Sequence, residues 1–157
     1  MALVVEDGSV VTGANTYVSL AEFKAWADDR GITYGTDAAV TQQIYRAMDY
    51  FERLQFIGNK ANENQPLQWP RTEALIDGYY ADATEIPTPV KTALYEAVVV
   101  EAAGNSELEV QDRKTIREKI GDIEVQYADN SENRKITPAL QYALNKIVQP
   151  ALQVLRV

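Results

Sequence analysis

The stretch TPVKTALYEAVVVEAAG, residues 88–104, decides the fold class of this chain. It opens with Thr88-Pro89, a capping residue followed by proline, which is typical of the first turn of a helix. The run from Ala97 to Val100 is apolar on nearly every side of such a helix, and Gly104-Asn105 marks its end. We therefore predict a central, buried helix over residues 88–104 and a mainly α fold.

Two further helices are predicted before it. Ser19 and Glu22 have the spacing of a capping box, which predicts a helix over residues 19–30. Another helix is predicted over residues 37–55, where apolar residues recur at spacings of three and four, as on one face of an amphipathic helix. Its aromatic side chains are interpreted as core packing, with a base-stacking platform as the alternative. Residues 1–18 are expected to be extended or loop-like.

A fourth helix is predicted over residues 138–149. Thr137-Pro138 repeats the cap-then-proline start, and Pro150 should kink or end the helix. The expected fold is therefore a four-helix bundle in one domain of residues 1–157. Its apolar C-terminal tail, residues 151–157, is expected to pack either on the parent domain or on another protein.

Asparagine, proline and glycine residues interrupt the chain between residues 59 and 87, which predicts a long loop without a long regular element. Trp69-Pro70-Arg71 lies in its middle. Two interpretations of Trp69 stay open: it holds the loop on its own core, or it contacts a neighbouring subunit. The acidic residues that follow lack the spacing and the central glycine of a calcium loop, so we interpret them as a solvated surface.

A β-hairpin is predicted over residues 114–128. Gly121-Asp122 suits a two-residue type II′ turn, and counting outward from it pairs Ile120 with Ile123. One face of the hairpin is then mostly apolar and the other is charged. A lone two-stranded hairpin is barely stable in water, so this one is expected to pack on its own helices or on another subunit.

Composition argues against several classes of function. The formal net charge is −8, and both cysteine and histidine are absent, which removes the usual thiolate and imidazole chemistry of enzymes and metal sites. No glycine-rich phosphate loop, no basic signal peptide and no apolar run long enough to span a membrane is found in the sequence. We therefore expect a protein that is not an enzyme and that is made in the cytosol.

Six stretches resemble a family of tailed-bacteriophage proteins encoded among head genes. The most distinctive of them is QPLQWPRT, residues 65–72. The others are ANTYVSLA (14–21), AMDY (47–50), FIGNK (56–60), IPTPVK (86–91) and IGDIEVQYA (120–128). Members of this family carry the label "DnaT-like single-stranded DNA-binding protein". The helix order is also similar to that of phage head–tail connector proteins, which are called adaptors or head-completion proteins.

The connector resemblance implies a virion protein of the neck, made in the host cytoplasm. It implies a homo-oligomer, a twelve-membered ring, that binds the portal protein and a tail-completion or tail-terminator protein. Genomic DNA would pass through its channel without specific binding. Because the chain is acidic and does not interleave basic with aromatic residues, we expect the adaptor function, with single-stranded DNA binding as the alternative. No catalytic residue, cofactor, metal ion or membrane contact is expected.

Two groups of residues are expected to make contacts with other molecules. The subunit interface is expected to contain Trp69, Arg71, Arg117, Lys119, Ile123, Val125 and Tyr127. The portal or a neighbouring subunit is expected to bind the tail through Leu152, Val154, Leu155 and Val157.

Overall fold

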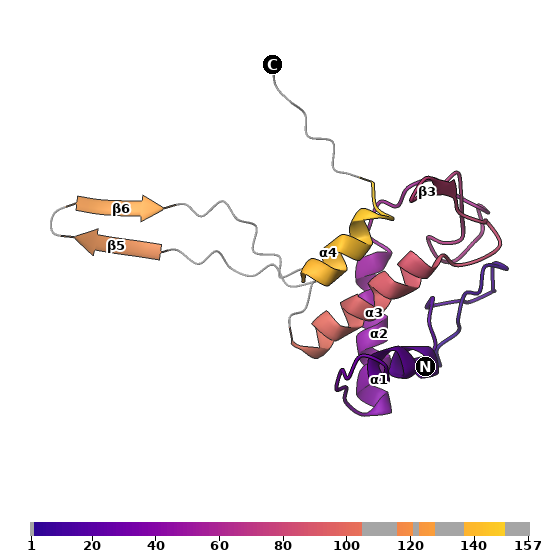
Figure 1. Ribbon diagram of the computed structural model, residues 1–157, viewed down its shortest axis with the longest axis horizontal. Helices are drawn as coiled ribbons and strands as arrows, with labels where there is room; N and C mark the ends of the chain where they lie inside the picture. The colour runs from indigo at the N-terminus through magenta and orange to yellow at the C-terminus, as the bar shows by residue number, and fades with distance from the viewer. Residues whose placement is uncertain (1, 105–115, 121–122, 128–136, 150–157) are drawn as a thin grey trace, which may run out of the picture.

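The computed structural model describes residues 2–104, 116–120, 123–127 and 137–149 (Figure 1). The helices are α1 (Leu20–Asp28), α2 (Asp37–Phe51), α3 (Thr88–Ala102) and α4 (Pro138–Asn145). The strands are β1 (Asn59–Lys60), β2 (Arg71–Thr72), β3 (Leu75–Ile76), β4 (Tyr79–Tyr80), β5 (Ile116–Ile120) and β6 (Ile123–Tyr127). The described part is thus helix-rich and mixed α/β, and it is not clearly the four-helix bundle that we expected.

Helix α3 is the central element, as its sequence predicts. It packs against both α2 and α4, and Figure 1 shows it crossing α2 in the middle of the helices. Ala97, Val98 and Val100 are at most 2% exposed although they point to different sides of the helix, so the apolar run is buried on several sides. The cap differs from the prediction, because Thr88 is already the first helical residue and Pro87 precedes it without a side-chain cap.

Two of the predicted helix starts are confirmed in detail. The Ser19 hydroxyl accepts a hydrogen bond from the Glu22 amide at 3.1 Å, and the Glu22 carboxylate accepts one from the Ser19 amide at 2.7 Å. The Thr137 hydroxyl accepts a hydrogen bond from the Leu140 amide at 3.3 Å. All four helices end earlier than predicted, since their last residues are Asp28, Phe51, Ala102 and Asn145.

The N-terminal segment forms a closed loop rather than a simple extended strand. The Glu6 amide donates to the Thr16 carbonyl at 2.8 Å, which closes the loop. The Glu6 carboxylate is fully buried and accepts hydrogen bonds from the amides of Gly8, Val10 and Val11 at 2.9–3.0 Å. A buried carboxylate needs such partners, because an unpaired charge in the interior is costly. Glu6 is therefore the residue that shapes this loop.

The stretch 59–87 is more ordered than a structureless loop. β1 pairs with β2, and β3 pairs with β4, both antiparallel. β3 and β4 are joined by Asp77 and Gly78, whose φ angles are 50° and 89°. Positive φ at both central residues is the requirement of a type I′ hairpin turn, for which Asp-Gly is a favoured sequence. The signal for this short hairpin was present in the sequence and our loop prediction missed it.

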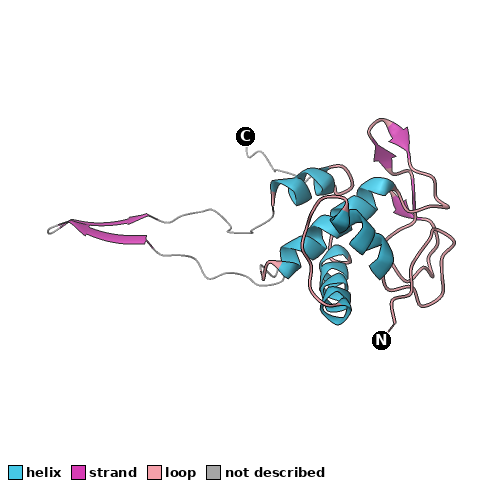
Figure 2. Cartoon of the chain, turned by 60° about the horizontal axis from the view of Figure 1, so that its bottom comes forward, coloured by secondary structure: helices cyan, strands magenta, loops and turns pink. Residues whose placement is uncertain are grey.

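The register of the second hairpin is the one predicted. β5 and β6 pair antiparallel with Ile116 opposite Tyr127 and Ile120 opposite Ile123. The turn residues Gly121 and Asp122 lie outside the described residues. Figures 1 and 2 both show this pair standing away from the helices. No helix among the described residues is both long enough and apolar enough to cross a membrane.

Replacement of Gly8 by alanine should destabilise the fold by about 3 kcal/mol or more. Gly8 has φ +109°, and a Cβ there would lie 2.2 Å from the Thr84 carbonyl oxygen. Gly13 is the matched control, because it has φ +74° but no atom within 4 Å of an added Cβ. Gly13→Ala should cost only about 1–2 kcal/mol, the penalty of the left-handed conformation. Urea unfolding measures both, and equal losses would contradict the close packing of Gly8 on residues 84–85.

Candidate functional site

One buried hydroxyl joins three parts of the chain that are distant in sequence. The Tyr17 hydroxyl donates to the Glu52 carboxylate at 2.8 Å. It accepts hydrogen bonds from the backbone amides of Gln68 at 3.0 Å and Trp69 at 3.2 Å. Tyr17 itself is 0% exposed. The segment before α1, the residue after α2 and the block around Trp69 are thereby held together.

The structure places Trp69 in the core of its own chain, which is one of the two interpretations left open by the sequence. Its side chain is 0% exposed and meets Phe56 edge to face, with ring centroids 5.9 Å apart. The peptide bond between Trp69 and Pro70 is cis. A contact of this block with a neighbouring subunit is not tested by a single chain and stays a prediction.

Arg71 donates mainly to backbone carbonyls of its own chain. Its Nε donates to the Ile57 carbonyl at 2.8 Å, and its Nη2 donates to the Gly58 carbonyl at 2.6 Å. Its Nη1 donates to the side-chain oxygen of Gln68 at 3.1 Å. Arg71 is 8% exposed, and burial lowers the pKa of its guanidinium. The planar fork of arginine suits such a set of acceptors, so Arg71 fixes the chain after α2 against the Trp69 block.

The electrostatics of this cluster are those of a structural site. Burial raises the pKa of the Tyr17 hydroxyl well above its ordinary value, and the neighbouring Glu52 charge raises it further. Burial also raises the pKa of the Glu52 carboxyl, while the hydrogen bond from Tyr17 acts in the opposite direction. Tyr17 therefore stays protonated at neutral pH. The cluster presents no nucleophile paired with a solvent-accessible base, and it offers no acyl- or phosphoryl-transfer chemistry.

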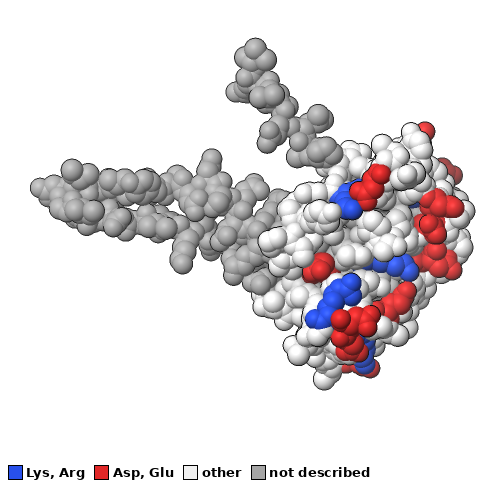
Figure 3. All heavy atoms as spheres, viewed as in Figure 1, with Lys and Arg blue, Asp and Glu red and all other residues white. Residues whose placement is uncertain are grey.

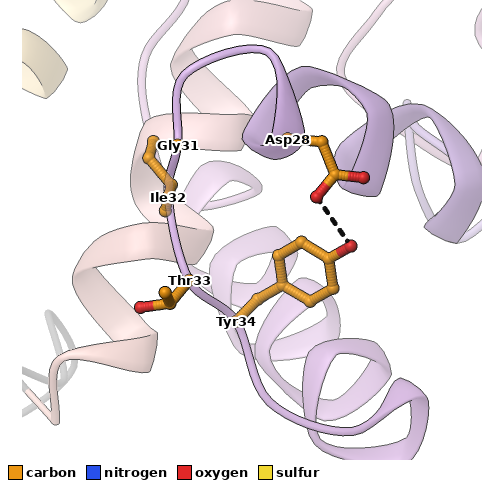
Figure 4. Close-up of a pocket in the computed structure, with 5 residues that line it drawn as sticks. All are labelled: Asp28, Gly31, Ile32, Thr33 and Tyr34. Atoms are coloured by element: carbon orange, nitrogen blue, oxygen red, sulfur yellow. Dashed lines mark hydrogen bonds between the residues drawn. The ribbon is translucent and has the colours of Figure 1, made fainter.

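Two surface hollows of the described part lie beside α1, and both are open to solvent. One lies at the connection from α1 to α2, where the Tyr34 hydroxyl donates to the Asp28 carboxylate at 2.9 Å (Figure 4). A second lies beside it, and there Lys24 pairs with Asp37 at 2.9 Å. No group of three or more metal-binding side chains occurs within the described ranges. Neither hollow is a candidate active site.

Four large apolar side chains are exposed on β3, β4 and α4, and the sequence did not predict their exposure. Leu75, Tyr79 and Tyr80 on β3 and β4 are 53%, 81% and 74% exposed, and Tyr142 on α4 is 67% exposed. We call these four residues the tyrosine surface. Lys146 links its two parts, because its Nζ lies 2.8 Å from the Asp77 carboxylate at the β3–β4 turn and 5.3 Å from the centroid of the Tyr142 ring.

Charge is divided unevenly along the chain. Residues 1–104 contain 15 acidic and 7 basic side chains, whereas residues 105–157 contain 8 of each. Within the second part, residues 113–119 hold four basic side chains and one acidic side chain. On the face that Figure 3 shows, basic side chains lie beside acidic ones and form no continuous track. The helical body is therefore acidic, and the chain leading into and through β5 is basic.

The remaining predicted contact residues are placed only in part. Arg117 and Lys119 occupy alternate positions of β5, and Ile123, Val125 and Tyr127 occupy alternate positions of β6. The tail residues Leu152, Val154, Leu155 and Val157 lie outside the described residues. Of the predicted contact residues, Trp69 and Arg71 lie together in the buried cluster. The assignment of each predicted residue to an interface stays a prediction.

Tyr17→Phe should lower the free energy of unfolding by about 2–3 kcal/mol, because it removes three hydrogen bonds of a buried hydroxyl, including the one that the buried Trp69 amide makes. Tyr34→Phe is the matched control. It removes the same hydroxyl from a hydrogen bond to Asp28 that is exposed to solvent, and it should change stability little. Chemical unfolding followed by circular dichroism measures both variants. Similar losses in the two would show that the Tyr17 hydroxyl does not join the three segments.

The raised pKa of Glu52 predicts a specific pH dependence. The folded state holds the proton more tightly than the unfolded state, whose pKa is near 4.5. The stability that this group contributes is therefore present below pH 4.5 and is lost as pH rises through its folded pKa. Glu52→Gln should gain stability relative to the unmodified protein across this range. Unfolding curves measured from pH 4 to 7 test this, and parallel profiles for the two proteins would contradict it.

Comparison with known proteins gives one match. The family described as "Putative DnaT-like ssDNA binding protein" matches residues 1–157, which is the whole chain. Comparison with curated proteins and with solved structures gives no match. A family match over the full length agrees with the resemblance of the QPLQWPRT block, whose residues build the buried cluster around Trp69. The chain belongs to this DnaT-like family.

Proposed function

We propose that this protein is a self-assembling structural subunit, a phage head–tail adaptor, and not an enzyme. The observation that carries the proposal is the β5–β6 hairpin, which stands away from the helices in Figures 1 and 2. Two strands alone are barely stable in water, so such a hairpin needs a surface to bind. A neighbouring subunit supplies that surface in a ring.

The charge of the body supports the same function. Residues 1–104 hold 15 acidic and 7 basic side chains, and an acidic surface discourages phosphate binding. Such a surface suits a channel through which DNA slides without being held. The proposed partners are further copies of this chain in a twelve-membered ring, the portal protein and a tail-completion protein. The proposed location is the neck of the virion, where residues 151–157 dock on the portal or on a neighbouring subunit.

Single-stranded DNA binding is the second candidate, and the comparisons favour it because the family description names it. The part of the chain that suits it best is residues 113–119, with four basic side chains and one acidic side chain. Binding of this kind usually combines a basic groove with stacked aromatic side chains. The tyrosine surface supplies aromatic rings, but the chain between Arg71 and Lys91 contains acidic residues and no basic one. Geometry and charge in the described part therefore favour the adaptor.

Two measurements on the purified protein separate the candidates. Sedimentation velocity, alone and with portal protein, should show oligomers that bind portal. Fluorescence anisotropy with a labelled single-stranded oligonucleotide should show no tight binding at physiological salt. A monomer that binds the oligonucleotide with sub-micromolar, salt-sensitive affinity would overturn the adaptor and establish the second candidate.

Charge reversal makes the DNA measurement specific. Arg117→Glu with Lys119→Glu reverses two charges in β5. Arg46→Glu with Arg53→Glu is the matched control, because it makes the same change in net charge at exposed positions of the helical body. If the second candidate holds, only the β5 pair abolishes oligonucleotide binding. If the adaptor holds, neither pair alters binding, and only the β5 pair impairs assembly.

A further inference from the structure

We propose that the tyrosine surface is the docking site for the β5 segment, residues 113–120, of a second copy of this chain. The inference rests on the self-assembly part of the proposed function and assigns the two surfaces that meet. It implies a head-to-tail contact, in which each copy offers a β5 segment on one side and a tyrosine surface on the other.

The tyrosine surface exposes several large aromatic side chains to solvent. Its three tyrosines are between 67% and 81% exposed. Together they present on the order of 400 Å² of aromatic side chain to solvent. Leu75 and Tyr80 lie on one face of the β3–β4 hairpin and Tyr79 on the other, so a partner can reach exposed rings from both sides. Tyrosine is among the residues that contribute most at protein interfaces.

The surface is also held in a fixed shape. Ile76 and Ala81 pack against the core, and the Ala81 amide donates to the Ala74 carbonyl at 2.8 Å. Lys146 ties the β3–β4 turn to α4 through its 2.8 Å contact with Asp77. A surface that is already ordered loses little conformational entropy when a partner binds.

The charge around the surface selects the chemistry of the partner. Glu73, Asp82 and Glu85 lie in the stretch between Arg71 and Lys91, which contains no basic residue. Asp77 lies in the same stretch and is already paired with Lys146. Figure 3 shows acidic side chains gathered at the edge of the molecule where β3 lies in Figure 1. The partner should therefore combine apolar and basic side chains. A nucleic acid, with its row of phosphates, is repelled by the same charges.

The chain itself contains a segment with this composition. Residues 113–120 read RKTIREKI, with four basic, one acidic and two isoleucine side chains. Complementary charge of this kind guides association and fixes register. In Figures 1 and 2 the β5–β6 pair and the β3–β4 hairpin lie at opposite ends of the molecule. That placement favours a contact between two copies over a contact within one copy.

A contact between two different surfaces has a predictable consequence for assembly. After two copies join, one β5 segment and one tyrosine surface remain free, so further copies add until a ring closes. A two-fold symmetric contact would stop at a dimer instead. The proposal therefore connects one pair of surfaces to the formation of a ring.

Mixing two defective variants tests the contact directly. Tyr79→Ser with Tyr80→Ser removes the surface, and Arg117→Glu with Lys119→Glu reverses charge in the segment. Each variant alone should lose self-association by about tenfold or more, judged by sedimentation velocity. A mixture of the two retains one intact surface of each kind and should form one-to-one dimers that do not grow. Tyr79→Phe with Tyr80→Phe keeps the aromatic area and should assemble as the unmodified protein does.

The outcomes separate this inference from the proposed function. If the serine variant still forms full oligomers, the docking site is wrong while the adaptor function stands. If each variant is monomeric but the mixture does not associate, the two surfaces do not meet and the inference fails. If the unmodified protein is monomeric with and without portal, both fail. Oligonucleotide binding that the serine variant loses and the phenylalanine variant keeps would identify the surface as a base-stacking site and overturn the proposal. Circular dichroism confirms that each variant is folded.

Discussion

The fold depends on the hydrogen bonds of one buried hydroxyl, that of Tyr17. It reaches the Glu52 carboxylate after α2 and the amides of Gln68 and Trp69, and without it the buried Trp69 amide would lose this hydrogen bond. Arg71 completes the arrangement by binding the carbonyls that follow α2. A stretch rich in proline and asparagine can therefore keep one conformation. The helices bury apolar area, but this polar cluster determines how the connection between α2 and α3 runs.

Features that depend on neighbouring residues were predictable from the sequence. The capping box at Ser19, the central position of α3 and the register of β5 with β6 each follow from spacing along a short stretch. Features that depend on distant residues were not. Tyr17 and Trp69 are 52 positions apart, and no periodic pattern relates them. The sequence also left two environments possible for Trp69, the core of its own chain or a contact with a neighbouring subunit. The environment of Trp69 is set by residues far along the chain.

The tyrosine surface was missed for a different reason. Asp77-Gly78 is a strong hairpin signal, but the flanking strands contain two residues each, and the surrounding prolines and asparagines favoured a loop. Exposure is also a property of the folded chain. The structure packs Ile76 against the core and leaves the rings of Tyr79 and Tyr80 in solvent. The uneven distribution of charge, by contrast, can be counted in the sequence. It suggests a contact between copies only when the acidic body and the β5 segment are seen to be separate in space.

The two candidate functions draw on the same basic residues, and this has a physical consequence. Residues 113–119 carry four basic side chains, which bind either phosphates or the acidic edge around β3, but not both at once. If the β5 segment docks on a neighbouring copy, its charges are neutralised by carboxylates and its affinity for DNA falls. Assembly then removes the most basic stretch from contact with nucleic acid and leaves the net negative charge of the body facing solvent. Under the proposed assembly, each subunit would bind DNA less well as it joins its neighbours, and a channel for moving DNA requires this property.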